Sequence, residues 1–193
     1  RLILLSELEH FCARYPHVRI RLLNYSAPQA VKALENNIID FAIVSTPVLV
    51  HKHMHQEKLV SYDEILLGGT KYKQFAQQVH YLEDISEMPL IGLCEGSSTH
   101  THYSRFFMEH DLPFEPDMEA AMTDQVLPMI THNLGIGFYP KSLALEAIEK
   151  ELVFPIELTE PLPNRDVVVI TNNHTPINSA SRRFLEFLLE NRK

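Results

Sequence analysis

The sequence contains little cysteine, the residue from which disulfide scaffolds and many structural zinc sites are built. Its 193 residues include two cysteines and no tryptophan. Cys12 and Cys94 lie far apart and form no Cys-x-x-Cys pair, so we expect no zinc site, and no motif calls for a cofactor. Hydrophobic residues make up 45% of the chain, which is enough for a core without a metal or a disulfide. Sparse cysteine also suits a reducing compartment such as the cytoplasm.

Basic residues are the second shortage. The chain has 17 Lys and Arg against 25 Asp and Glu, and its formal net charge is -8. A nucleic-acid-binding domain normally has a basic surface that neutralises phosphates. We therefore expect this chain to bind DNA poorly by itself.

Long apolar runs and catalytic motifs are missing as well. No stretch approaches the roughly 20 apolar residues of a membrane span, and the run Leu2–Leu5 is too short for the apolar part of a signal peptide. The sequence has no serine elbow, no phosphate-binding loop and no paired-carboxylate motif. The expectation is a protein that is not an enzyme and does not contact a membrane.

What the sequence does contain is an alternation of helical and strand patterns. Spacing and capping predict helices over 2–14, 26–35, 72–78, 100–110 and 123–133, one that opens at Pro140, and a last one that ends at Leu189. Short apolar or alternating runs predict strands at 18–23, 41–44, 65–67, 89–93, 118–122, 136–139, 152–156 and 166–171, with an irregular stretch over 45–62. This order indicates an α/β protein with parallel sheets covered by helices.

Several motifs, taken in order, resemble those of one family. Arg14–Arg21 reads Arg-Tyr-Pro-His-Val-Arg-Ile-Arg, and Ala30–Glu35 and Ile39–Val44 follow it at the expected places. Met88–Ser98 and the Gly-rich run Asn133–Pro140 complete the set. Each motif alone is weak, but together they resemble the effector-binding domain of LysR-type transcriptional regulators across nearly the whole chain.

This resemblance implies a type 2 periplasmic-binding-protein-like fold, in which two Rossmann-like lobes are joined by two crossover strands. On this sequence, lobe I is residues 1–68 and 169–193, and lobe II is 69–168. The crossovers are expected near 67–70 and 167–171.

The resemblance also implies partners and a cellular place. It implies a cytoplasmic bacterial regulator that assembles as a homodimer or homotetramer and senses a small-molecule effector. DNA would be contacted only by an N-terminal helix-turn-helix part that this sequence does not contain. Domains of the family usually begin with a strand and a loop, whereas this sequence starts inside the first helix, so we expect part of the effector site to be missing.

Candidate effector contacts follow from helix starts. Ligands of open α/β sheets bind at the carboxyl ends of strands, where free N–H groups and the helix dipole attract anions. The predicted contacts at or near such ends are Ser26, Ser45, Thr46, Gly96, Ser97, Ser98, Thr99, Thr123 and Phe138. If the lobes face each other, these ends converge on one cleft that suits an organic anion. Ser and Thr at helix starts are, however, often only caps.

Histidines and one cysteine suggest other roles. His51, His53 and His55 alternate, as do His100 and His102, but exposed histidines are more common than a metal site or a pH sensor. Cys94 follows a buried run and is more often structural than reactive.

Two other functions stay open at this point. A solute-binding protein of a transporter has the same predicted fold, and an enzyme could use the same two-lobed scaffold. A helix-turn-helix upstream would favour the regulator, and a signal peptide would favour the transporter protein.

Overall fold

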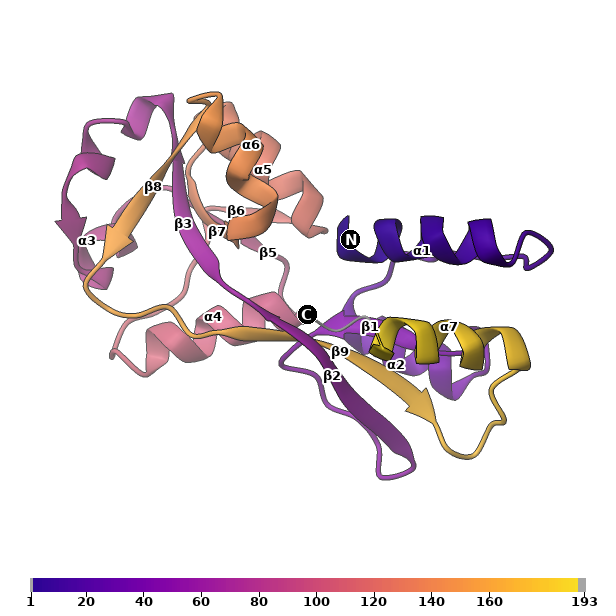
Figure 1. Ribbon diagram of the computed structural model, residues 1–193. Helices are drawn as coiled ribbons and strands as arrows, with labels where there is room; N and C mark the ends of the chain where they lie inside the picture. The colour runs from indigo at the N-terminus through magenta and orange to yellow at the C-terminus, as the bar shows by residue number, and fades with distance from the viewer. Residues whose placement is uncertain (1, 191–193) are drawn as a thin grey trace. The chain divides into compact units, whose positions relative to one another are not determined.

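The computed structural model describes residues 2–190 and divides them between two compact units (Figure 1). Unit 1 contains residues 1–60 and 166–193, and unit 2 contains 61–165. The chain passes between the units twice, at 60/61 and at 165/166. The predicted lobe boundaries, 68/69 and 168/169, lie inside strands, and the outer ends of lobe I, residue 1 and residues 191–193, fall outside the described residues.

Unit 1 is a three-stranded sheet with helices against both faces. The strand order is β1 (Ala42–Ser45), β9 (Arg165–Asn172), β2 (Met54–Tyr62). Successive side chains of a strand point to opposite faces. Val168 and Ile170 therefore pack with α2 (Ala27–Glu35). Val169 packs instead with α1 (Leu2–Arg14) and α7 (Ser179–Glu190).

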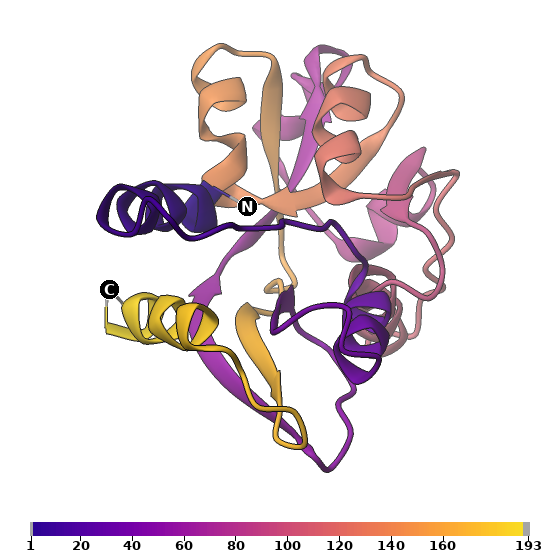
Figure 2. The same ribbon diagram turned by 90° about the vertical axis from the view of Figure 1, so that its right-hand side faces the viewer.

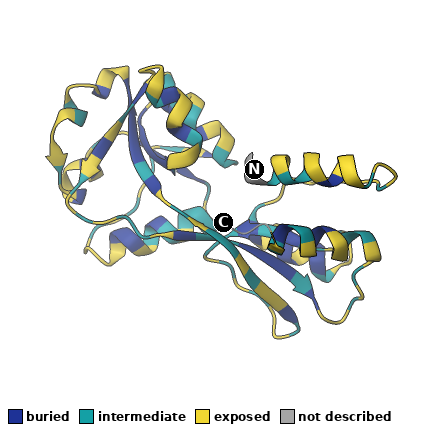
Figure 3. Cartoon of the chain, in the orientation of Figure 1, coloured by how far each residue is buried: buried dark blue, intermediate teal, exposed yellow. Residues whose placement is uncertain are grey.

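Unit 2 is built on a six-stranded sheet. Its order is β4 (Val79–His80), β8 (Val153–Leu158), β3 (Glu64–Gly69), β7 (Ile136–Pro140), β5 (Leu90–Leu93), β6 (Met118–Ala120). Leu66 belongs to the core under α3 (Leu82–Ser86) and α4 (Ser98–Met108). Leu67 belongs to the core under α5 (Thr123–Thr131) and α6 (Lys141–Glu149). Figures 1 and 2 show α5 and α6 together on one side of this sheet, and Figure 3 shows that buried residues concentrate in its strands.

The predicted parallel pairing holds for part of this sheet. β5 runs parallel to β6 and β7, and β4 runs parallel to β8. β3 is antiparallel to both of its neighbours, and in unit 1 β1 is antiparallel to β9. The prediction of parallel sheets was wrong for these pairs, because β3 enters unit 2 directly from β2, without the crossover helix that joins parallel neighbours.

Three local predictions were also wrong. Residues 18–23 form no strand, since no partner strand pairs with them among the described residues and a strand is stable only in a ladder. The stretch 45–62 was predicted irregular but contains β2, whose mostly exposed polar residues hide its strand character. The helix predicted at 72–78 is replaced by two single 3-10 turns, Thr70–Tyr72 and Phe75–Gln77.

Among the helices of residues 2–190, none has the length and apolar character that a span requires.

Candidate functional site

The strongest part of the predicted site lies at the amino end of α4, in unit 2. Gly96 adopts a φ of +81°, which favours glycine, and a Cβ added there would meet nothing within 4 Å. Ser97 is the N-cap of α4, and its Oγ accepts a hydrogen bond from the His100 N–H at 3.1 Å. The helix begins two residues earlier than predicted. Ser98 and Thr99 therefore belong to its first turn, where backbone N–H groups lack helical partners.

A buried polar network fixes this turn to the sheet. Arg165, which is 2% exposed, donates from Nη1 to Glu64 Oε1 at 3.1 Å and to Thr99 Oγ1 at 3.0 Å. Glu64, which is 7% exposed, also accepts a hydrogen bond from the Tyr103 hydroxyl. The guanidinium carbon of Arg165 lies 5.8 Å from the centre of the Tyr62 ring. Thr99 is thereby held in place by an arginine that itself has a buried counter-ion.

The network perturbs the titration of its neighbours. Burial, with the Glu64 carboxylate next in importance, raises the pKa of Tyr103 well above its ordinary value. Burial and then the charge of Arg165 lower the pKa of His102 to about 4, although the Pro163 carbonyl and Glu109 act in the opposite direction. His102 is therefore neutral at pH 7.

Two polar atoms on α4 are buried without a hydrogen-bond partner in the part of the chain that the structure describes. They are Ser98 Oγ and His102 Nε2. The two residues are four positions apart, so they lie on one face of the helix. A buried polar atom that stays unsatisfied costs about 1–3 kcal/mol, which makes these atoms candidates for contact with a ligand.

The structure gives Thr123 and Phe138 other surroundings than those predicted. The N-cap of α5 is Met122, whose N–H donates to Gln125 Oε1 at 3.0 Å, so Thr123 is the first residue of this helix and not its cap. Phe138 is 7% exposed and stacks on Tyr103 with ring centres 4.2 Å apart. Its ring thus belongs mainly to the core. A ligand contact by either residue stays a prediction.

The predicted residues of unit 1 sit at the ends of α2 and β1. Ser26 precedes α2, and its N–H donates to Gln29 Oε1 at 3.0 Å, which is one half of a capping box. Thr46 Oγ1 accepts a hydrogen bond from the Asp166 N–H at 3.1 Å, and the Thr46 N–H donates to the Asp166 carbonyl at 2.9 Å. Ser45 is the half-buried last residue of β1. Thr46 therefore joins β1 to β9, and its role toward an effector stays a prediction.

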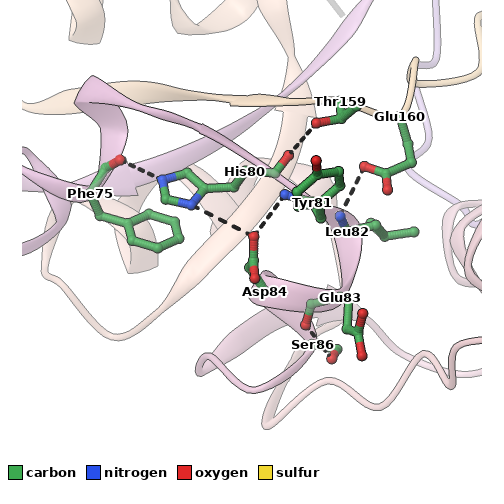
Figure 4. A network of polar contacts seen from close by, with 9 residues as sticks. All are labelled: Phe75, His80, Tyr81, Leu82, Glu83, Asp84, Ser86, Thr159 and Glu160. Carbon is green, nitrogen blue, oxygen red and sulfur yellow. Dashed lines mark hydrogen bonds and ion pairs between the residues drawn. The ribbon is translucent and has the colours of Figure 1, made fainter.

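Unit 2 also has an open cavity of about 490 Å³ that none of the predicted residues lines. Its wall includes Glu160, and Figure 4 shows the contacts that hold this wall. Glu160 Oε2 accepts the Leu82 N–H at 2.9 Å, and the Thr159 N–H donates to the His80 carbonyl at 2.8 Å. His80 stacks on Phe75 with ring centres 3.5 Å apart. The network holds the cavity wall in place, and among the described residues no buried side-chain oxygen or nitrogen of this wall lacks a hydrogen-bond partner.

The sequence reasoning missed Glu64 and Arg165. Both lie one residue outside the strands predicted at 65–67 and 166–171, and the sequence analysis did not consider them. A signal was present, because Glu64 shares a strand face with Leu66, a residue expected in the core. A charge in register with buried residues indicates an ion pair.

The histidines and Cys94 form no recognisable metal site. His51, His53 and His174 stack on one another, with ring centres 5.7 and 4.7 Å apart, and His51 Nε2 lies 2.9 Å from Glu35 Oε1. Within residues 2–190, no group of three or more His, Cys, Asp or Glu is arranged to hold a metal ion. Cys94 is half-buried and free.

Comparison with curated proteins finds distant sequence relatives of this chain. The "HTH-type transcriptional regulator GltR" of Bacillus subtilis is 22% identical over 144 residues, which cover 75% of this chain and 47% of that protein. The "HTH-type transcriptional regulator YofA" of Bacillus velezensis is 20% identical over 178 residues, which cover 92% of this chain and 59% of that protein. The chain thus spans only about half the length of the curated relatives that it matches.

Solved structures share the fold. The Synechocystis CcmR regulatory domain, solved in complex with 2-PG, superposes with a TM-score of 0.87 at 16% identity and covers 100% of this chain and 92% of that one. The effector-binding domain of QuiR, solved with shikimate, gives 0.83 at 16% identity and covers 98% and 90%. These neighbours confirm the type 2 periplasmic-binding-protein-like fold predicted from the sequence. A family model described as the LysR substrate binding domain matches residues 1–193, and the chain belongs to that family.

Proposed function

We propose that this chain is the sensing domain of a longer transcriptional regulator and that its effector is an organic anion bound at the amino end of α4. The observation that carries the proposal is the turn Gly96–Ser97, which leads into a helix whose first residue, Ser98, has a buried hydroxyl oxygen with no hydrogen-bond partner among the described residues. First-turn N–H groups and the helix dipole favour a negative charge at this place.

The relatives support a regulatory role. GltR and YofA are transcriptional regulators, CcmR is a regulatory domain and QuiR has an effector-binding domain. None of these names describes a transporter protein or an enzyme. We propose that the longer protein binds DNA through a separate helix-turn-helix part, works as a homodimer or homotetramer in the bacterial cytoplasm, and has no catalytic activity.

The proposed mechanism is a population shift. An effector can change the regulator only by binding one of its conformations more tightly than another. Its binding energy is then available to bias the attached DNA-binding parts. An acidic sensing domain, with a net charge of -8, would keep DNA contacts confined to those parts.

Thermal unfolding of the chain against a panel of small carboxylates tests the proposal. A ligand at 100 times its Kd stabilises the folded state by about 2.7 kcal/mol, which for a chain of this size corresponds to about 5–10 °C. Because the chain has no tryptophan, calorimetry or a dye should be used as the readout.

A serine variant tests whether the carboxylate binds at the amino end of α4. Ser98→Ala should weaken carboxylate binding about tenfold or more, because a hydrogen bond to a charged group contributes about 1.5–3 kcal/mol. Ser142→Ala is the matched control, since Ser142 is an exposed serine in the first turn of α6. Equal affinities in the two variants would show that the anion does not bind at α4.

A further inference from the structure

The open cavity of unit 2 lies where two paired strands of its sheet separate. The last pair of the β3–β8 ladder joins Leu66 to Ile156. Beyond this pair β8 continues beside β4, whereas the rest of β3, down to Glu64, stays beside β7. Residues 63–66 and 155–158, on the two sides of the separation, line the cavity of about 490 Å³. This volume lies within the roughly 300–1,000 Å³ that small-molecule sites occupy.

Much of the cavity wall is apolar. Ala76, Leu158 and Leu162 line it, are partly buried, and pack against the core cluster that contains Leu66 and Ile156. A hydrocarbon chain or ring placed against these side chains would remove apolar surface from water on both partners. The wall therefore favours a ligand with a hydrocarbon part over a fully polar one.

The charged side chains of the wall all have one sign. They are the carboxylates of Asp63, Glu64, Glu157 and Glu160. No Lys, Arg or His is present among the described residues that line the cavity. Glu64 is neutralised by Arg165 at an N–O distance of 3.1 Å, but the other three form no salt bridge with any described residue. A ligand of complementary charge is therefore a cation.

One of these carboxylates is held in place without losing its charge. Glu160 Oε2 accepts the Leu82 N–H at 2.9 Å, a hydrogen bond that connects the cavity wall to the first residue of α3 (Figure 4). A carboxylate has two oxygens and about four acceptor positions. Glu160 therefore keeps acceptor capacity for a ligand.

The arrangement of the carboxylates favours an organic cation over a metal ion. Across the part of the chain that the structure describes, no three His, Cys, Asp or Glu side chains are placed to hold a metal. A metal ion requires several oxygens at short, fixed distances. A primary ammonium group has three N–H donors and binds as a compact point charge, so it requires fewer acceptors and a less exact geometry.

We propose that this cavity is a second ligand site, for a small amphipathic amine. The ammonium group binds the carboxylates of Asp63, Glu157 and Glu160, and the hydrocarbon part lies against Leu158 and Leu162. None of the residues predicted as effector contacts lines this cavity, and its ligand has the opposite charge to the anion proposed at α4. The two sites are therefore separate, and neither proposal depends on the other.

Four small probes test the chemistry of the site. They are hexylammonium, butylammonium, hexanol and hexanoate, titrated into the isotope-labelled chain while the amide NMR shifts are followed. Hexylammonium should bind most tightly, with shifts concentrated at residues 63–66 and 155–164. Butylammonium should bind about three- to tenfold more weakly, because it buries two methylene groups fewer. Hexanoate should bind more weakly than hexanol, since the carboxylates of the wall repel it.

A double variant tests the role of the carboxylates. Asp63→Asn combined with Glu157→Gln should weaken hexylammonium binding about three- to tenfold, because each exposed ion pair contributes modestly. The affinity for hexanol should stay unchanged in this variant. Glu115→Gln combined with Glu119→Gln is the matched control, since it removes the same charge from exposed residues on β6 and just before it, at the opposite edge of the sheet from β4. This control should bind hexylammonium like the wild type.

Each of four results would overturn the amine site. Hexanol or hexanoate could bind as tightly as hexylammonium, or the two double variants could weaken binding equally, which would assign the effect to net charge alone. The amide shifts could lie outside the cavity, or no probe could produce a saturable shift. The anion site at α4 is tested separately by the carboxylate panel and by Ser98→Ala, so none of these results bears on it.

Discussion

Removing the buried carboxylate of Glu64 should destabilise unit 2 strongly. Glu64 and Arg165 are 7% and 2% exposed and are joined by an N–O distance of 3.1 Å. Breaking a buried ion pair from one side costs about 3–5 kcal/mol, because the remaining charge stays in a poorly solvated place. Glu64→Gln should cost an amount in this range even though an amide can still accept from Tyr103.

Urea and thermal unfolding measure this effect. A loss of 3–5 kcal/mol corresponds to a fall in Tm of about 6–20 °C for a chain of this length. Glu146→Gln is the matched control, since Glu146 forms an exposed ion pair with Lys150 and exposed pairs contribute about 0–1 kcal/mol. A cost below about 1 kcal/mol for Glu64→Gln would refute the argument that this pair anchors unit 2.

A double variant of Glu64 and Arg165 tests whether the two residues act as a pair. Glu64→Gln combined with Arg165→Met removes the stranded charge as well, so the double variant should be more stable than Glu64→Gln alone. If the double variant loses the sum of the two single losses, the residues do not act as a pair.

Two further predictions concern the surroundings of this network. The pKa of His102 is lowered in the folded chain from 6.5 to about 4, so the unfolded chain binds more protons between these two pH values. The free energy of unfolding should therefore fall as the pH drops from 6.5 to 4. The expected loss is about 1–2 kcal/mol once solvent screening of this partly exposed ring is included. Unfolding of the wild type and His102→Leu across this range measures it, and an equal slope in both would contradict the assignment. Phe138→Ala should lower the free energy of unfolding by about 3–5 kcal/mol, because it removes a ring that stacks on Tyr103 in the core. Leu49→Ala is the control in the same unfolding assay and should change stability little, since the Leu49 side chain is 94% exposed. Similar losses of stability in the two variants would place Phe138 outside the core.

The sequence predicted most of the fold because apolar patterns are a local signal. The strand at Phe41–Val44 was predicted from a short apolar run, and the helix that ends at Leu189 from its cap and its amphipathic spacing; both exist with small shifts at their ends. Strand β2 was missed because its residues alternate only weakly between buried and exposed. Its stability comes from its place beside β9, which is distant in sequence.

Only those residues of the candidate site that lie at the start of a helix could be predicted from the sequence. The Gly96–Thr99 turn was found because glycine followed by serine and threonine is a local pattern for a helix start. Arg165 and Glu64 are 101 residues apart, so the position of Glu64 on a buried strand face indicates a partner, but the local sequence does not identify that partner. His102 was weighed as an exposed residue, a metal ligand or a pH sensor, and the burial of its Nε2 became visible only in the structure.

The same ion pair has a topological consequence. Unit 2 begins at Ser61 and ends at Arg165, and the contact of Arg165 with Glu64 brings its entry and its exit together. A segment whose two ends meet is an insertion in the architectural sense, and such segments can be excised or moved into another host without stretching the chain. Residues 61–165 contain two complete core clusters of their own. Unit 2 thus has the organisation of a domain with its own core that is inserted between β2 and β9.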